Sequence, residues 1–272
     1  MVDAIVVDPQ QQQGYDIVYD PSISGQQYVP EQAPQRPPFS VRQVVAQRAR
    51  LELVEGAVVN YGFGIPDEIA SLVAADGEQD RYFQTIEHGT YGGTLLTGHL
   101  FGYARNPSCM IDGPAQFDFY AGGGLDIAFL GFGELDAQGN VNTSMLGGLP
   151  VGPGGFIDIA QNARKVVFCG TFDTKGAKMT AQDGQLRIEQ HGQIGKLVDK
   201  VQQITFSGQQ ALQRGQQVLY VTERAVFELG ADGVYLREVA PGVDIETDVV
   251  QRMGFVPRRE QVTVMRGFEH FA

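Results

Sequence analysis

A glutamate at the end of a predicted strand is the first candidate for chemistry. Glu87 follows the apolar segment 82–86, and Gly89, Gly92 and Gly93 come shortly after it. Ligands of open α/β sheets bind beyond the carboxyl ends of the strands. The carboxylate would therefore stand in the binding region, and the glycines would leave room for a bulky substrate. Glu-x-Gly is a weak motif by itself, and spacing alone favours an ordinary surface glutamate.

The glycine-rich segment 152–156 is the second candidate. Gly152, Gly154 and Gly155 lead into a helix predicted over 156–163. Free backbone N–H groups at such a helix start can hold an anion or a developing oxyanion. A tight connection without a ligand explains the same residues, so the two interpretations are about even. The segment matches neither a dinucleotide fingerprint nor a P-loop.

Other catalytic and metal-binding patterns are missing from the sequence. The four histidines show no metal-ligand spacing, so no metal site is predicted, and no GxSxG motif indicates a hydrolase triad. His88 alone among the histidines has a notable neighbour, because it directly follows Glu87. Cys109 and Cys169 have no CxxC spacing, and buried free thiols in a reducing compartment are the simplest interpretation.

Composition and charge limit the classes of function. The formal net charge is −12 at pH 7, which argues against binding to nucleic acid or to anionic membranes. An acidic chain can still bind a polyanionic ligand through backbone donors or a few placed basic residues. The sequence has neither a signal-peptide pattern nor an apolar run of about 18 residues. We therefore expect a cytoplasmic protein that does not enter the membrane.

Apolar runs and turn signals indicate how the chain is organised. Strands are predicted over 57–61, 82–86, 125–131, 165–170 and 217–222, and helices over 40–53, 66–75 and 156–163. This alternation is typical of an open, mostly parallel α/β sheet with helices on both faces. The segment 133–144, turning at 138–140, is predicted to form a hairpin insertion.

The two ends of the chain differ from its middle. Residues 1–38 are rich in Gln and Pro, and we predict that they form an extended arm or linker. Residues 39–272 are expected to form one α/β domain. Within it, residues 244–253 are predicted to form a short helix, which an irregular tail follows.

Several segments resemble family I CoA-transferases, and they occur in the same order as in that family. They are 58–66, 85–89, 116–126, 139–142, 152–157, 161–171 and 221–227. The similarity is greatest to the propionate and acetate CoA-transferase group, in which an α-like and a β-like half are fused. It covers about residues 40–255 and implies an open α/β fold of the CoA-transferase type. The chain would represent the C-terminal, β-type half.

The resemblance also implies a ping-pong reaction with Glu87 as the nucleophile. Its carboxylate would attack an acyl-CoA, and a glutamyl-CoA thioester would then pass CoA to a second small carboxylic acid. Gly154 and Gly155 match the family's backbone oxyanion donors. Acyl-CoA is then a substrate, and no permanently bound cofactor is expected. The CoA site is expected to include four glycines, Gly62, Gly64, Gly89 and Gly152.

Two departures from the family pattern keep alternatives open. His88 stands where the family usually has a small residue or an amide, and an imidazole there is able to act on water. A CoA-thioester hydrolase on the same scaffold is therefore one alternative. The fused enzymes are also about twice as long, so the chain is either a subunit that acts with an α-type partner in a hetero-oligomer or a fragment of a fused enzyme. In both cases we expect an exposed surface for the missing half. A noncatalytic subunit is a further alternative, which the intact Glu87 and glycine segment disfavour. The sequence does not identify the acyl group, the acceptor acid or the stoichiometry.

Overall fold

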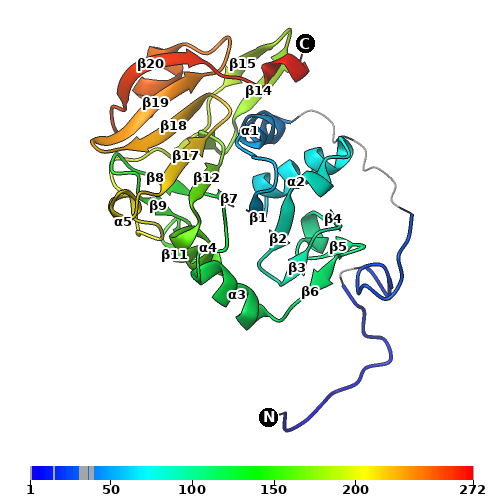
Figure 1. Ribbon diagram of the computed structural model, residues 1–272. Coiled ribbons are helices and arrows are strands. Elements are labelled where there is room, and N and C mark those ends of the chain that lie inside the picture. The colour runs from blue at the N-terminus through cyan, green and yellow to red at the C-terminus, as the bar shows by residue number, and fades with distance from the viewer. Residues whose placement is uncertain (1, 15, 31–35, 37–39, 272) are drawn as a thin grey trace.

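The computed structural model describes the chain except for residues 1, 15, 31–35, 37–39 and 272. Ten strands of the described part form one mixed sheet (Figure 1). Their order across the sheet is β20 (Arg258–Val264), β19 (Gly233–Val239), β18 (Ala225–Gly230), β17 (Gln217–Val221), β12 (Lys165–Cys169), β7 (Ile127–Gly131), β1 (Val58–Tyr61), β2 (Phe83–Ile86), β3 (Thr90–Tyr91) and β6 (Cys109–Met110).

The centre of the sheet is parallel and its margins are mixed. Strands β17, β12, β7, β1 and β2 are parallel, and each lies within a segment predicted to be a strand. Strands β18, β3 and β6 pair antiparallel with their neighbours, whereas β19 and β20 pair in parallel. The predicted fold class, an open and mostly parallel α/β sheet, is confirmed.

Two expectations for exposed segments are wrong. The tail after residue 253 is not irregular, because it contains β20, which pairs with β19 at the edge of the sheet. Most side chains of β20 are exposed, so its sequence lacks the apolar alternation that marks a half-buried strand. Cys109 is exposed on the edge strand β6, whereas Cys169 is buried as expected.

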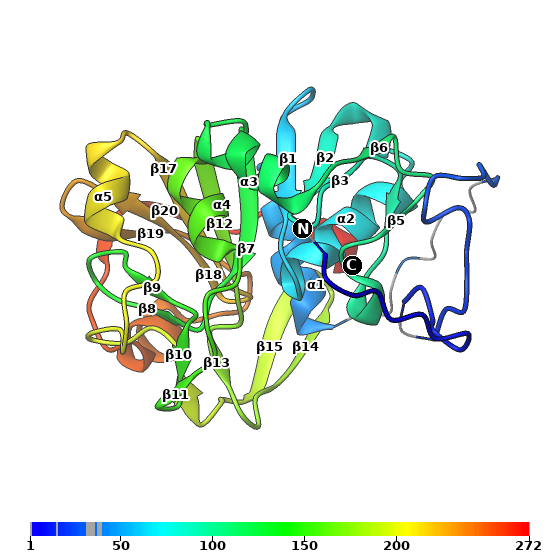
Figure 2. The same ribbon diagram turned by 90° about the horizontal axis from the view of Figure 1, so that it is seen from below.

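Short hairpins extend from the ends of the central strands. The predicted hairpin is present as β8 (Glu134–Leu135) and β9 (Val141–Asn142). Its turn is held by Asp136, whose Oδ1 accepts hydrogen bonds from the N–H groups of Gln138 and Asn140, both at 3.0 Å. A second hairpin follows, and Figure 2 shows it beside β13. The additional pairs are β10 (Met145–Leu146) with β11 (Leu149–Pro150), β13 (Asp173–Thr174) with β16 (Ile194–Gly195), β14 (Lys178–Gln182) with β15 (Gln185–Gln190), and β4 (Thr94–Leu95) with β5 (Ala104–Arg105).

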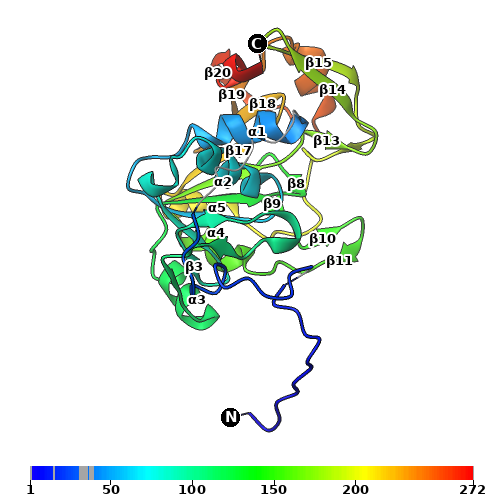
Figure 3. The same ribbon diagram turned by 90° about the vertical axis from the view of Figure 1, so that its right-hand side faces the viewer.

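Helices cover both faces of the sheet (Figure 3). On one face lie α1 (Val41–Arg50) and α2 (Ile65–Ala75), and on the other lie α3 (Gly113–Ala121), α4 (Phe156–Asn162) and α5 (Gly208–Gln213). Alternate residues of the central strands enter two separate apolar cores, as in β7, where Ala128 and Phe129 face opposite sides. None of the described helices has the length and apolar character needed to cross a membrane.

The remaining helical segments are single turns. The helix predicted over 244–253 is present as a π-helical turn, Ile245–Val249, and a 3₁₀ turn, Val250–Arg252. Asp244 caps it by accepting hydrogen bonds from the N–H groups of Glu246 and Thr247. The other 3₁₀ helices are Gln79–Arg81, Gly98–Leu100 and Phe268–Phe271.

The described residues before residue 31 contain no helix or extended strand, and the part from Gln13 to Val29 is tied by hydrogen bonds to the β5–β6 region. Tyr103 donates a hydrogen bond from its hydroxyl to the carbonyl of Gln13 at 3.1 Å. The Asn106 backbone N–H donates to the carbonyl of Ser22 at 2.9 Å. The boundary predicted after residue 38 lies outside the described residues, so the division into arm and domain stays a prediction.

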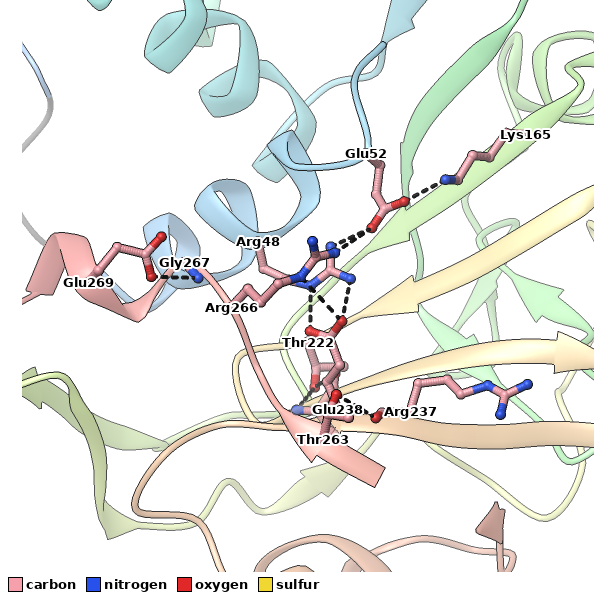
Figure 4. A network of polar contacts seen from close by, with 11 residues as sticks. Arg48, Glu52, Lys165, Thr222, Arg237, Glu238, Thr263, Arg266, Gly267 and Glu269 are labelled. Atoms are coloured by element: carbon pink, nitrogen blue, oxygen red, sulfur yellow. Dashed lines mark hydrogen bonds and ion pairs between the residues drawn. The ribbon is translucent and has the colours of Figure 1, made fainter. Parts of the chain in front are cut away.

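A buried arginine ties α1 to the sheet (Figure 4). Arg48 donates two hydrogen bonds to the carboxylate of Glu238 in β19, at 2.6 and 2.7 Å, and one to Glu52 at 2.6 Å. Glu52 also accepts a hydrogen bond from Lys165 of β12. The side chain of Arg48 is only 4 % exposed. The network therefore joins three elements through a charge that water cannot solvate.

Replacing Arg48 with methionine is expected to destabilise the protein strongly. The variant leaves Glu238 buried without its bidentate partner, and breaking a buried pair in this way costs about 3–5 kcal/mol. Urea unfolding measures the change in the free energy of unfolding. Arg81→Met is the matched control, because Arg81 forms its ion pairs with Glu55 and Glu78 at the surface and should be nearly neutral. An Arg48→Met variant as stable as this control contradicts the expectation.

Candidate active site

Glu87 lies directly after β2, at the edge of the sheet where all five parallel central strands end. Two hydrogen bonds fix the residue before it. Gln116 of α3 donates from its side-chain amide to the carbonyl of Ile86 at 3.1 Å, and Gly89 donates from its backbone N–H to the same oxygen at 2.9 Å. Ile86 is buried, whereas Glu87 is partly exposed. The strand end therefore holds the backbone while the carboxylate reaches outward.

The side chain of Glu87 lies against Gly155. A Cβ atom placed on Gly155 would stand 2.2 Å from Oε2 of Glu87 and 2.7 Å from Cζ of Phe117. Only a glycine leaves space for the carboxylate and the aromatic ring at this point. The structure thus brings together Glu87 and the glycine-rich segment, the two candidates that the sequence placed at strand and helix ends.

The glycine segment presents two unpaired backbone donors. Its start is held by Ser144, whose carbonyl accepts hydrogen bonds from Val151 at 2.9 Å and from Gly152 at 3.2 Å. Within the described part of the chain, no acceptor receives a hydrogen bond from the N–H of Gly154 or of Gly155. Unpaired N–H groups beside a carboxylate are suited to stabilise an oxyanion that forms on a carbonyl between them.

Helix α3 supplies supporting residues to which the sequence assigned no role. Tyr120 is fully buried, and its hydroxyl lies 2.7 Å from Oγ1 of Thr85 in β2 and accepts a hydrogen bond from Asn60 of β1 at 3.0 Å. Burial raises the pKa of Tyr120, so the group stays neutral. Gln116 and Tyr120 are four residues apart and so lie on one face of a helix. That spacing is the signal that would have identified them as positioning residues.

The four glycines predicted to bind CoA fall into two pairs. Cβ atoms on Gly62 and Gly89 would lie 3.1 Å from the carbonyl oxygen of Phe129 and 2.0 Å from that of Ile111, so both glycines allow the chain to pack against itself. Gly64 and Gly152 have positive φ, as Gly89 does, but they have more room: a Cβ on Gly64 would approach only Arg42, at 4.0 Å, and one on Gly152 would have no heavy atom within 4 Å. A role in CoA binding stays a prediction for all four.

His88 lies next to Glu87 in sequence but does not bind its carboxylate. The imidazole packs edge to face on Phe101, with ring centroids 5.8 Å apart, and fills the space beside Gly102. No described residue, His88 included, forms a hydrogen bond or ion pair with the carboxylate of Glu87. The lone pairs of Glu87 are therefore available to a substrate.

Glu87 is expected to titrate above the ordinary range of a glutamate. Burial raises its pKa by disfavouring the charged form, and the charge of His88 opposes this shift. As the pH falls through this raised pKa, the nucleophilic carboxylate is lost. Replacing His88 with asparagine should move the titration to still higher pH. Carbon-13 NMR of labelled glutamate measures both values, and a Glu87 pKa at or below the ordinary value contradicts the expectation.

Comparison with known proteins finds relatives that share much of this sequence. A scan against protein-family models finds no match. The chain is 42 % identical over 258 residues to acetate CoA-transferase YdiF of Escherichia coli K12, covering 94 % of this chain and 49 % of that protein. It is 27 % identical over 219 residues to the acetate CoA-transferase subunit beta of the same organism, covering 77 % of this chain and 90 % of the subunit.

A solved structure is similar over the whole chain. The crystal structure of YdiF from E. coli O157:H7, described as a thioester complex with CoA, matches with a TM-score of 0.90 and 40 % identity. It covers 100 % of this chain and 50 % of that one. Fold and similarity together define a CoA-transferase domain. The chain belongs to the family I CoA-transferases, as its sequence motifs predicted, and it spans about half the length of the YdiF proteins that it matches.

Proposed function

We propose that this chain is the β-type, nucleophile-bearing part of an acyl-CoA:carboxylate CoA-transferase. The observation that carries the proposal is the contact between the Glu87 carboxylate and Gly155, beside two unpaired N–H groups. The names of its relatives support it, since they include two acetate CoA-transferase proteins and a thioester complex with CoA.

The first half of the reaction loads CoA onto the enzyme. The carboxylate of Glu87 attacks the thioester carbonyl of an acyl-CoA, a C–O bond forms, and the C–S bond breaks to release CoA thiolate. The thiolate then attacks the Glu87 carbonyl of the mixed anhydride and expels the first acid as its carboxylate. A glutamyl-CoA thioester remains. A second carboxylate reverses these steps and leaves as the new acyl-CoA, so no proton or water is consumed.

The environment of Glu87 suits this chemistry. Each attack creates an oxyanion, and the N–H groups of Gly154 and Gly155 are the donors we assign to it. Loss of one such donor typically costs about 3 kcal/mol in the barrier. Partial burial raises the pKa of Glu87, and the absence of a described hydrogen-bond partner leaves the carboxylate reactive.

No observation favours the two alternatives. A hydrolase would need a group that directs water at the glutamyl carbonyl, but the ring of His88 packs on Phe101 and Gly102. A noncatalytic subunit would have no use for a carboxylate and two unpaired donors at one point. Transfer accounts for both features.

We further propose that an α-type half completes the active site. Apolar side chains are exposed on the segments that flank the glycine loop, including Leu149 at 68 %, Val151 at 57 % and Ile157 at 41 %. A monomer gains little from exposing such groups together, whereas a partner that covers them would also close the cleft over Glu87. The proposed enzyme is a cytoplasmic hetero-oligomer that acts on acyl-CoA and a small carboxylic acid.

Product analysis tests transfer against hydrolysis. The enzyme that contains this chain and an α-type subunit is incubated with acetyl-CoA, with and without labelled propionate. Transfer predicts labelled propionyl-CoA and an equal amount of free acetate, with no accumulation of free CoA. Accumulation of free CoA and acetate in the absence of propionate contradicts transfer. The same products from His88→Asn would confirm that the imidazole is dispensable, and full activity of the isolated chain would refute the need for a partner.

A further inference from the structure

Lys196 carries a charge for which the described chain supplies no partner. It directly follows β16, and its Nζ stands 4.3 Å from the ring centroid of Phe132. No described residue accepts a hydrogen bond from this ammonium group or forms a salt bridge with it. The charge of the buried Glu223 favours the ammonium form, but this carboxylate also accepts a hydrogen bond from the N–H of Phe172 at 2.8 Å and pairs with Arg224 at 3.3 Å. A half-buried ammonium group without an anion is costly, and a ligand can supply the missing charge.

A pocket of about 410 Å³ opens beside Lys196. Its lining combines apolar and polar side chains, among them Phe132, Leu146, Ile194, Thr171, Thr174 and Gln202. Glu134 also lines the pocket, but its carboxylate accepts hydrogen bonds from Asn142 at 2.7 Å and from Gln202 at 2.8 and 3.0 Å. The lining therefore holds two charged groups, and among the described residues the Glu134 carboxylate has hydrogen-bond donors whereas the Lys196 ammonium group has no hydrogen-bond acceptor.

The pocket lies at the same edge of the sheet as Glu87. Phe132 follows the end of β7 and Thr171 follows the end of β12, two of the parallel strands. Leu146 belongs to the hairpin β10–β11, which leads directly into the glycine segment 152–155. The pocket is thus built on the connection that also holds the proposed oxyanion donors, yet it shares no residue with the Glu87 site.

We infer that this pocket binds the carboxylate of a small aliphatic acid, with Lys196 as its counter-ion. One ammonium group balances one negative charge, whereas a phosphate monoester carries nearly two at neutral pH. Apolar walls formed by Phe132, Leu146 and Ile194 suit a short hydrocarbon chain, and the hydroxyl groups of Thr171 and Thr174 can donate to the second carboxylate oxygen. The inference goes beyond the proposed function, because it assigns a binding site for a carboxylic acid that is separate from the Glu87 site. Binding there does not depend on the transfer reaction.

The charge state of Lys196 makes the site sensitive to pH. Burial lowers the pKa of Lys196 to about 8. Binding of an anion favours the charged form, so occupancy should raise this pKa. The affinity for the acid should be greatest below about pH 7, where Lys196 is charged, and should fall as the pH rises through the pKa of Lys196 in the complex.

Calorimetric titration of the full chain with butyrate tests the inference. Lys196→Met keeps the aliphatic stem but removes the charge, and it should weaken butyrate binding at least about tenfold. Lys200→Met is the matched control, because Lys200 is exposed on the same segment and should change nothing. Glu87→Ala should also leave this affinity unchanged, which separates the pocket from the proposed catalytic site. Inorganic phosphate should bind more weakly than butyrate.

A second measurement covers the case in which Lys196→Met does not fold. The chain has five lysines, so carbon-13 labelling of lysine resolves their side-chain Cε signals in the native protein. Butyrate should raise the pKa of one lysine that titrates near 8 and leave the other four unchanged. Unaltered butyrate affinity in Lys196→Met, tighter binding of phosphate, or no pKa change on saturation would each overturn the inference. Failure of CoA transfer with butyrate binding intact would count only against the proposed function.

Discussion

Replacing Glu87 with alanine is expected to abolish CoA transfer while the fold survives. The carboxylate is the group that becomes covalently bound to CoA, and loss of a nucleophile costs about 10⁴-fold or more in turnover. The side chain of Glu87 makes no hydrogen bond or ion pair with any described residue, so little stability depends on it. The initial rate of propionyl-CoA formation from acetyl-CoA and propionate measures the loss, and thermal unfolding monitors the fold.

Two further variants make this result specific. Glu87→Gln keeps the shape of the side chain and should be equally inactive, because an amide cannot carry the acyl group. Glu55→Ala removes an exposed carboxylate near the start of β2, whose ion-pair partner among the described residues is Arg81, and should leave turnover unchanged. Turnover retained by Glu87→Ala would exclude this residue as the nucleophile.

Replacing Gly155 with alanine is expected to lower turnover by about 10²-fold. The added Cβ would stand 2.2 Å from Oε2 of Glu87 and 2.7 Å from the ring of Phe117, so both side chains must move. A displacement of about 1 Å at a reacting group has an effect of this size. The φ angle of Gly155 is −78°, which alanine adopts without strain, so the variant should fold. Its steady-state kcat measures the effect.

Gly113→Ala is the matched control for this substitution. Gly113 begins α3, and no heavy atom lies within 4 Å of a Cβ at that position. The same methyl group should therefore be neutral there. Wild-type turnover in Gly155→Ala would contradict the close contact between Glu87 and the glycine segment.

The parallel core of the fold was predictable because of where its strands lie. Central strands of a parallel sheet are buried on both faces, so they read as continuous apolar runs, such as 57–61 and 165–170. Strand β20 was missed because its exposed edge position permits the polar sequence 258–264. The two-residue strands β10 and β11 are too short to leave a periodic pattern.

The site was predictable in its parts but not in its assembly. The sequence identified Glu87 and the glycine segment as separate candidates, and only the family resemblance linked them. Their contact depends on how β2 and the loop after β11 are placed in space, which no local pattern encodes. Lys196 gave no signal at all, because a single lysine in a polar stretch is usually solvated. Its significance depends on the missing partner, which only the packed structure reveals.

The mass of the peptide that contains Glu87 tests the central claim most directly. The enzyme is incubated with acyl-CoA, treated with borohydride, digested and compared with a sample that received no acyl-CoA. The account predicts a CoA adduct on Glu87 before reduction, and conversion of its side chain to the alcohol afterwards, only in the sample with acyl-CoA. An unmodified Glu87 peptide during turnover, or an adduct on a different residue, would contradict it.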